Sequence, residues 1–285
     1  MKKMFAIVLA ALMVAAMLAG CGSSTAETKA PETTATPAPA TEAAAPAETE
    51  APAETEAAAA FTTIEAGKLI MSTNAAFPPY EMVADDGSFE GIDVEIAGAV
   101  AAKLGLELVI DDMDFDAALL AVQQGKSDIV MAGVTVNEDR KMVMNFSDTY
   151  SKGVQVVIVK EGSDVTLDNL GDQMIGTQRG TTGYIYASGD YGEDHVTAYD
   201  NGASAVQALA NGQVDCVIID SAPAEAFVEA NPGLTILDTE YTVEDYAIGM
   251  SKDNTALLEA VNGALKDLTA DGTIPAIVEK YIPTK

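Results

Sequence analysis

Arg140 and the residues just before it form the part of the chain best suited to chemistry. The apolar run Ile129–Met131 predicts a short buried strand, and Gly133 and Thr135 follow its end. Backbone amides, a hydroxyl and a guanidinium gathered at a strand end can bind a carboxylate, because the planar fork of an arginine matches both oxygens of that group. This stretch therefore predicts one half of an anion-binding site.

The position of Arg140 raises a question of charge. Asn137 is a good helix N-cap, so a helical turn is expected to begin there and to place the guanidinium against the positive end of the helix dipole. A surface salt bridge to Glu138 or Asp139 would compensate this charge, and so would the carboxylate of a ligand. The residues alone favour neither explanation.

A second group of polar residues occurs further along the chain. Thr181 and Thr182 lie in the segment GTTG, where a strand is expected to turn into a helix. Two hydroxyls and successive amides at a helix start can seat an anion, whereas a simple N-cap would use only one threonine. Asp220 ends an apolar strand, where its carboxylate could take an ammonium group or cap the helix expected at 222–229.

Three aromatic residues, Phe77, Tyr80 and Phe115, are candidates for the walls of an apolar slot, with partial burial in the core as the alternative. Chemistry that needs a His–Cys pair or a His and Cys metal cluster is nearly excluded, because the chain has one histidine and two cysteines. The sequence has no Walker-type phosphate loop and no calcium-binding loop of spaced carboxylates. We therefore predict no catalytic residue, no metal site and no cofactor.

The composition narrows the class of partner. The chain has 285 residues, enough for one or two domains, and 48% of them are hydrophobic, which allows a sizeable core. The formal net charge of −29 disfavours nucleic acid and anionic membrane surfaces as partners, since both attract basic patches.

The N-terminus is predicted to be a targeting segment. Residues 1–21 combine Lys2 and Lys3 with an apolar run that is short for a membrane span, and they end in Leu-Ala-Gly-Cys. This ending resembles the lipobox of bacterial lipoproteins, in which the cysteine, here Cys21, is acylated; an ordinary secretory signal or an uncleaved anchor is the alternative. Residues 22–60, rich in Ala, Pro, Thr and Glu, predict a disordered tether. We expect an extracytoplasmic protein that is held at the cell membrane by lipid.

The residues from Phe61 onward predict alternating strands and helices. Strands are expected at 68–72, 89–92, 106–110, 129–131, 153–159, 173–176, 216–220, 234–237 and 246–251, and helices at 93–104, 116–124, 184–187, 222–229, 255–269 and 274–281. The order helix, glycine, two residues, aspartate, strand occurs twice, around Asp128 and Asp215. This echo suggests two lobes of similar α/β build, unless two αβ units agree by chance. The chain is expected to cross between the lobes near 150–154 and 247–250.

Seven segments, taken in order, resemble bacterial extracellular solute-binding proteins of family 3, the amino-acid receptors of ABC importers. They are KLIMSTNAAFPPYEM, FEGIDVEIAGAVAAKLG, DMDFDAALLAVQQGKSDIVMAGVTVNEDRK, FSDTYSKGVQVVIVK, GTQRGTTG, DCVIID and EDYAIGMSK. The resemblance covers essentially all of 61–285. It implies an α/β fold of two Rossmann-like lobes joined by two hinge strands, the periplasmic-binding-protein type II arrangement. Lobe 1 would comprise 61–152 and 248–285, and lobe 2 would comprise 153–247.

The resemblance also implies a role for each candidate residue. These are Arg140, Gly133, Thr135, Thr181 and Thr182 for the α-carboxylate, Asp220 for the α-ammonium, Phe77 and Phe115 as walls around the ligand, and Asn74, Gln178 and Arg179 for its side chain. The implied partners are a free L-amino acid and the transmembrane subunits of an ABC importer, and we expect a monomer.

The residues that would face the ligand side chain bear on its identity. Many members of the family carry an acid where this chain has Asn74, so its amide weakens the case for a cationic ligand. An inward Arg179 would favour an acidic or amide ligand. We therefore expect a polar amino acid, with glutamine ahead of arginine and cystine left open. The alternatives are an enzyme resembling the cyclohexadienyl dehydratases, with Glu81 as its acid or base, and an amino-acid sensor on the same scaffold.

Overall fold

The computed structural model of this protein describes residues 61–238 and 240–283. The described residues all belong to one compact unit. The predicted signal segment, Cys21 and the predicted tether at 22–60 lie outside the described residues. Within the described ranges no helix is both long enough and apolar enough to cross a membrane.

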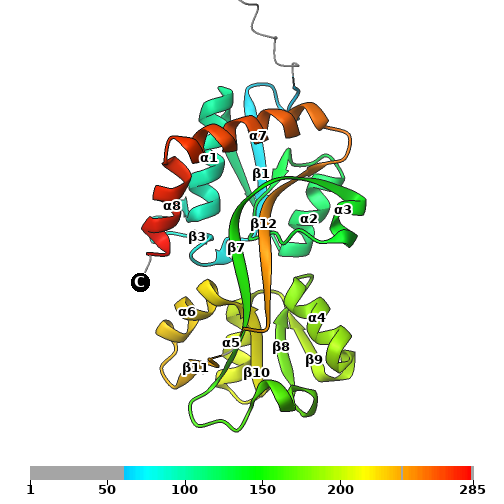
Figure 1. The fold of residues 1–285 in the computed structure, drawn as a ribbon, viewed down its shortest axis with the longest axis vertical. Helices are drawn as coiled ribbons and strands as arrows, with labels where there is room; N and C mark the ends of the chain where they lie inside the picture. The colour runs from blue at the N-terminus through cyan, green and yellow to red at the C-terminus, as the bar shows by residue number, and fades with distance from the viewer. Residues whose placement is uncertain (1–60, 239, 284–285) are drawn as a thin grey trace, which may run out of the picture. The chain divides into compact units, whose positions relative to one another are not determined.

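Nine strands form one sheet in the order β5-β1-β6-β12-β7-β10-β8-β9, with β11 paired to β7 (Figure 1). At one end, in lobe 1, β1 pairs in parallel with β5 and β6. The elements of lobe 1 are β1 (Lys68–Thr73), β2 (Ala76–Phe77), β3 (Glu81–Val83), β4 (Phe89–Glu90), α1 (Ile92–Leu104), β5 (Glu107–Asp112), α2 (Phe115–Gln123), β6 (Ile129–Val130), α3 (Glu138–Val143), α7 (Thr255–Ala270) and α8 (Thr273–Tyr281).

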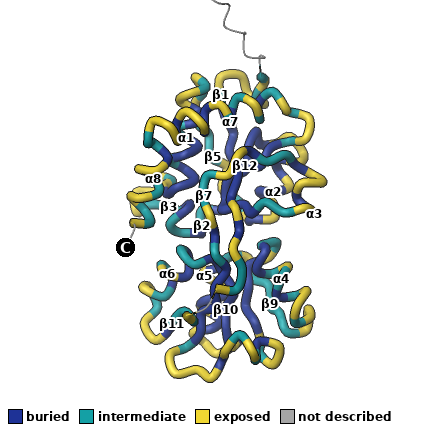
Figure 2. The backbone as a smooth tube through the Cα atoms, viewed as in Figure 1, coloured by how far each residue is buried: buried dark blue, intermediate teal, exposed yellow. Residues whose placement is uncertain are grey.

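The other end of the sheet belongs to lobe 2, where β8 pairs in parallel with both β9 and β10. The elements of lobe 2 are the 3₁₀ helices η1 (Leu167–Asp172) and η2 (Glu193–His195), β8 (Ile175–Gln178), α4 (Thr182–Tyr191), β9 (Val196–Tyr199), α5 (Gly202–Ala210), β10 (Cys216–Asp220), α6 (Ser221–Ala230) and β11 (Leu234–Ile236). In both lobes the buried backbone follows the strands and the exposed backbone lies on the outer helices and loops (Figure 2).

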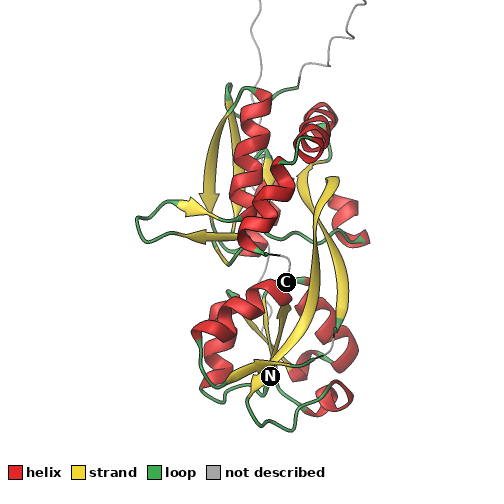
Figure 3. Cartoon of the chain, turned by 60° about the vertical axis from the view of Figure 1, so that its left-hand side comes forward, coloured by secondary structure: helices red, strands yellow, loops and turns green. Residues whose placement is uncertain are grey.

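Two long antiparallel strands, β7 (Met144–Lys160) and β12 (Thr242–Ser251), connect the lobes (Figure 3). They pair from Thr242 opposite Gln155 to Ser251 opposite Met144. The predicted fold class, two α/β lobes joined by two hinge strands, is confirmed. The lobe boundaries that we predicted, after residues 152 and 247, fall inside these two strands.

The two repeated aspartates, Asp128 and Asp215, make equivalent hydrogen bonds in the two lobes. Asp128, just before β6, accepts the Ile70 amide of the neighbouring strand at 2.8 Å and donates its own amide back to the Ile70 carbonyl at 2.8 Å. Asp215, just before β10, exchanges the same two bonds with Met174, both at 2.8 Å. Each aspartate therefore sets the register of a parallel strand at the point where a helix has just ended.

Two helices of lobe 1 begin or end close to their expected bounds. Gly105 ends α1 in the left-handed conformation, directly after the helix expected at 93–104. The helix expected at 116–124 begins one residue earlier, at Phe115, so that Asp116 lies in the first turn of α2. Between the first two expected strands, the structure adds the two-residue strand β2, which starts the small sheet β2-β3-β4.

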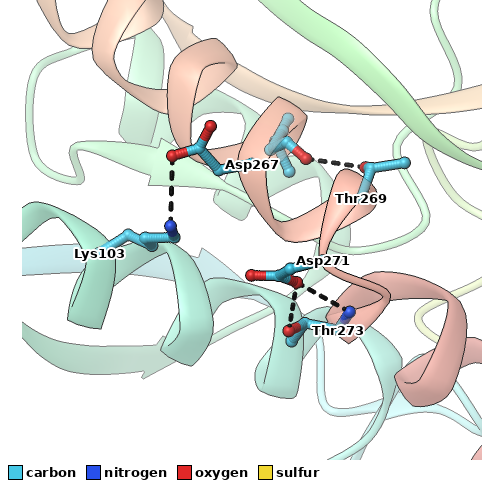
Figure 4. A network of polar contacts seen from close by, with 6 residues as sticks. Lys103, Asp267, Thr269, Asp271 and Thr273 are labelled. Atoms are coloured by element: carbon cyan, nitrogen blue, oxygen red, sulfur yellow. Dashed lines mark hydrogen bonds and ion pairs between the residues drawn. The ribbon is translucent and has the colours of Figure 1, made fainter.

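The chain ends on lobe 1, where α7 and α8 pack beside α1. Lys103 of α1 forms an ion pair with Asp267 of α7 at 3.2 Å (Figure 4). Between the two C-terminal helices, Asp271 accepts bonds from the amide and the hydroxyl of Thr273, at 3.0 and 2.7 Å, in the turn that leads into α8. These helices return the end of the chain to the lobe in which its first strand lies.

Candidate ligand-binding site

A small cavity lies between the lobes, next to the carboxyl ends of β1, β6, β8 and β10. Its lining contains ten of the eleven residues to which the resemblance gave a role toward the ligand, with Arg179 as the exception, together with Glu81 and Ala132. The ten are Asn74, Phe77, Phe115, Gly133, Thr135, Arg140, Gln178, Thr181, Thr182 and Asp220. The structure brings these residues together, and their roles toward a ligand stay predictions.

Arg140 is buried at this cavity, with 7% of its surface exposed. Its Nη1 donates to the Thr135 carbonyl at 2.8 Å, and its Nη2 donates across to the Gly180 carbonyl of lobe 2 at 3.1 Å. The guanidinium also lies 5.4 Å from the centre of the Phe115 ring. The surface salt bridge considered for this residue is not formed, because Glu138 pairs instead with Lys141 at 2.9 Å.

The two threonines at the start of α4 have different partners. Thr181 caps the helix by accepting the Tyr184 amide at 3.3 Å, and its own hydroxyl donates to the Gln178 carbonyl at 2.8 Å. Thr182 is not needed as a cap, and its hydroxyl donates to Glu244 at 2.9 Å. The Thr182 hydroxyl also lies 3.3 Å from that of Thr135, which belongs to the opposite lobe.

Asp220 sits at the N-cap position of α6 but makes no capping bond with its side chain. Its carboxylate instead accepts bonds from Gln155 at 2.7 Å and from the Tyr246 hydroxyl. Burial raises the pKa of Asp220 to about 7, and the nearby carboxylate of Glu244 acts in the same direction. A carboxyl group with such a pKa needs a cation to hold its charge, and an ammonium group would supply one.

The amides predicted to read the ligand side chain are engaged with each other. Gln178 donates to the side-chain oxygen of Asn74 at 2.9 Å, and Asn74 donates to the Met113 carbonyl at 2.9 Å. Arg179 does not point inward: it is exposed and faces Asp200 at 3.4 Å. An inward Arg179 would have favoured an acidic or amide ligand, and its exposed position removes that support.

Two of the three candidate aromatics reach the cavity. Phe77 and Phe115 line it from lobe 1. Tyr80 is buried behind them, with its ring centre 5.9 Å from that of Phe77 and 5.2 Å from that of Tyr246. Tyr80 therefore supports the wall as part of the core.

A cluster of buried acids is the feature that the sequence did not reveal. Asp93, in the first turn of α1, accepts the Gly133 amide at 2.9 Å and the Tyr150 hydroxyl at 2.7 Å. Glu81 lies beside it in the cavity wall, completely buried. Burial, and then the like charge of Asp93, raise the pKa of Glu81 well above its usual range, and burial raises that of Asp93 to about 6.

Glu244, like Asp93, is a buried acid that the sequence analysis did not single out. It alternates along β12 with the exposed residues Val243 and Asp245 and shares the buried face with Tyr246. A charged residue on the inward side of an alternating strand was therefore a signal in the sequence. Within 61–238 and 240–283 no three His, Cys, Asp or Glu side chains gather so as to hold a metal ion.

The sequence of this chain is similar to that of a known protein family and of individual known proteins. Residues 69–284 match the family described as bacterial extracellular solute-binding proteins, family 3. A probable histidine-binding protein of Neisseria gonorrhoeae is 32% identical over 218 residues, which cover 74% of this chain and 81% of that protein.

Solved structures of similar proteins agree in fold. An ancestral arginine-binding protein bound to glutamine has a TM-score of 0.73 at 37% identity, over 76% of this chain and 99% of that one. The arginine-, lysine-, histidine-binding protein ArtJ of Geobacillus stearothermophilus has a TM-score of 0.73 at 31% identity, over 76% of this chain and 96% of that one.

The raised pKa of Asp220 predicts how stability depends on pH in the absence of ligand. The pKa is about 7 in the folded state against an ordinary value of 3.8 for an aspartate, so the folded state binds the extra proton between these limits. The contribution of Asp220 is present below about pH 4 and is lost as the pH rises through 7, by on the order of 4 kcal/mol. We expect Asp220→Asn, which does not titrate, to show a shallower fall of the free energy of unfolding.

Urea unfolding of the ligand-free protein at pH 4, 5, 6, 7 and 8 would measure this. Asp253→Asn, at an exposed carboxylate, is the control and should follow the original protein. Parallel curves for Asp220→Asn and the original protein would contradict the prediction.

Proposed function

Because this chain belongs to the bacterial extracellular solute-binding proteins of family 3, we propose that it is a lipid-anchored receptor that captures a polar L-amino acid and delivers it to an ABC importer. The observation that supports this most strongly is the cavity between the lobes, whose lining includes both the Arg140 guanidinium and the Asp220 carboxylate. The family and the relatives described above are binding proteins, and the chain is not an enzyme.

Each of the two charged groups of an amino acid has a suitable partner in the lining of the cavity. The Arg140 guanidinium, with the threonine-rich start of α4, suits the α-carboxylate, and the Asp220 carboxylate suits the α-ammonium. Arg140 comes from lobe 1, and Asp220 and α4 come from lobe 2. A zwitterion therefore contacts both lobes only when they are closed, so that its binding shifts the population toward the closed state.

The acidic residues at the cavity wall favour a ligand with a cationic side chain, so we expect arginine rather than glutamine. Asn74 and Gln178 already satisfy each other, which weakens the reason for expecting an amide ligand. Glu81 and Asp93 are buried side by side, and beyond this pairing the oxygens of Glu81 have no hydrogen-bond partner within the described residues. A guanidinium placed here would give the Glu81 carboxylate two donors and relieve the repulsion that raises its pKa.

If Arg140 binds the α-carboxylate of the ligand, then Arg140→Ala should lose most of the affinity for the amino acid. We expect L-arginine to bind at least about 100-fold more weakly, because truncating one partner of a buried charged pair costs roughly 3 kcal/mol or more. Isothermal titration with L-arginine measures it. Arg179→Ala, which removes the exposed arginine one residue beyond the cavity-lining Gln178, is the matched control and should bind as the original protein does. Unchanged affinity in Arg140→Ala would exclude this role.

If Glu81 binds the cationic side chain of the ligand, then Glu81→Gln should change the selectivity between amino acids. Affinity for L-arginine should fall by roughly tenfold or more, because a charged hydrogen-bond acceptor is removed, while affinity for L-glutamine should change little. Glu90→Gln, at an exposed acid on the adjacent strand β4, is the control. Competition of both amino acids against a fluorescent probe would show the result, and an equal loss for both ligands would contradict a guanidinium subsite.

The lipid anchor predicts that Cys21→Ser releases the protein from the membrane. Cys21 follows Leu-Ala-Gly at the end of the N-terminal apolar run. In cells fed labelled palmitate, the original protein should carry label in the membrane fraction, and Cys21→Ser should carry none. Cys216→Ala, at the buried cysteine of β10, should keep the label. Label that persists in Cys21→Ser would exclude acylation at this residue.

A further inference from the structure

Glu244 lies behind the cavity, on the hinge strand β12. Its side chain is buried, with 6% of the residue exposed, and it is not among the residues that line the cavity. The function proposed above does not use it. A buried carboxylate is costly unless hydrogen bonds and opposite charge compensate it, so its partners show what it does.

The Oε2 atom of Glu244 is bonded by three separate elements. It accepts from the Thr135 hydroxyl of lobe 1 at 3.1 Å, from the Thr182 hydroxyl of lobe 2 at 2.9 Å, and from the Gln155 amide of β7 at 3.0 Å. The same carboxylate is the charge that most favours the cationic form of Arg140, whose pKa burial lowers. Glu244 is thus a single acceptor shared by both lobes and both hinge strands.

This arrangement depends on closure. Thr135 and Thr182 belong to different lobes, and their hydroxyls lie 3.3 Å apart only because the lobes meet. When the lobes separate, one carboxylate oxygen on the hinge cannot keep both. Apart from an interaction of the carboxylate with Tyr186 of lobe 2, the Oε1 atom has no hydrogen-bond partner within the described residues, so it does not provide a second link to lobe 1.

We propose that Glu244 is a positioning residue that latches the two lobes together, through Thr135 and Thr182, before and during ligand binding. It acts on the ligand only through these two threonines, which line the cavity while Glu244 does not. The latch raises the fraction of protein in the closed, binding-competent state, and the apparent affinity for a ligand scales with that fraction.

A competing role is that Glu244 occupies the place of the ligand carboxylate. The geometry speaks against it, because the guanidinium of Arg140 donates to the Thr135 and Gly180 carbonyls and makes no hydrogen bond to Glu244. The two roles predict opposite effects of truncation. Removing a latch weakens ligand binding, whereas removing a competitor strengthens it.

The test uses full-length protein and three variants, Glu244→Ala, Glu244→Gln and Asp245→Ala. Asp245 is the next residue on β12 and is exposed, so Asp245→Ala is the matched control. Hydrogen–deuterium exchange, read by mass spectrometry without ligand, should be faster in Glu244→Ala for peptides across 131–137 and 178–184. Peptides from β1 and β5, which lie away from the hinge, should be unchanged.

Titration with L-arginine supplies the second readout. We expect Glu244→Ala to bind about tenfold more weakly with faster dissociation, and Asp245→Ala to match the original protein. Glu244→Gln keeps an oxygen that can accept both threonine hydroxyls, so it should restore most of the protection and affinity.

Three outcomes would overturn the latch: unchanged exchange in Glu244→Ala, tighter binding of L-arginine, or faster exchange throughout the chain, which would mean a structural role only. If L-arginine does not bind the original protein, the proposed ligand fails, while exchange without ligand still decides the latch.

Discussion

A buried guanidinium at the junction of two lobes is the constraint on which the rest of the site depends. Arg140 has lost most of its water, and the groups it bonds are carbonyls, which carry partial charge only. Moving such a cation out of water is expensive unless anions lie near it. The acids around it, above all Glu244 and Asp220, are what make its burial tolerable, and the carboxylate of a ligand would add to them.

The acids in turn outnumber the cation that they surround. Glu81, Asp93 and Asp220 are all buried, and burial raises the pKa of each. In the absence of a ligand these groups hold protons more tightly than they would in water, so the site is less negative than its formal charge. A ligand that brings an ammonium and a second cationic group would restore their charge. This charge balance supports the proposed preference for a cationic ligand, independent of any single contact.

The sheet explains how a site made by two lobes can open and remain one fold. β7 and β12 belong to both lobes and pair with each other across the junction, with irregularities in the register between Tyr246 and Gly249, while β1 and β10 stay within their own lobes. Thr135, Glu244 and Thr182 lie where the lobes meet these strands. A change in the angle between the lobes would therefore move the residues that line the cavity relative to one another.

The sequence by itself determined the elements and most of the cavity lining. Local signals were sufficient for these predictions. Apolar runs indicated the strands, and the repeated aspartates indicated the two lobes. Polar residues at strand ends indicated Arg140 and Asp220 as candidate binding residues. The resemblance to a family then joined the two halves of the site. These features could be predicted because each depends on neighbours in the chain.

Only the tertiary structure decided which way side chains point and what they meet across the lobes. It turned Arg179 outward, paired Asn74 with Gln178, and gathered Glu81 and Asp93 at one wall. It also brought Glu244 to the two threonines. These contacts join residues far apart in the chain, and the charge balance that they set is a sum over every group in the closed cavity, which no local pattern contains.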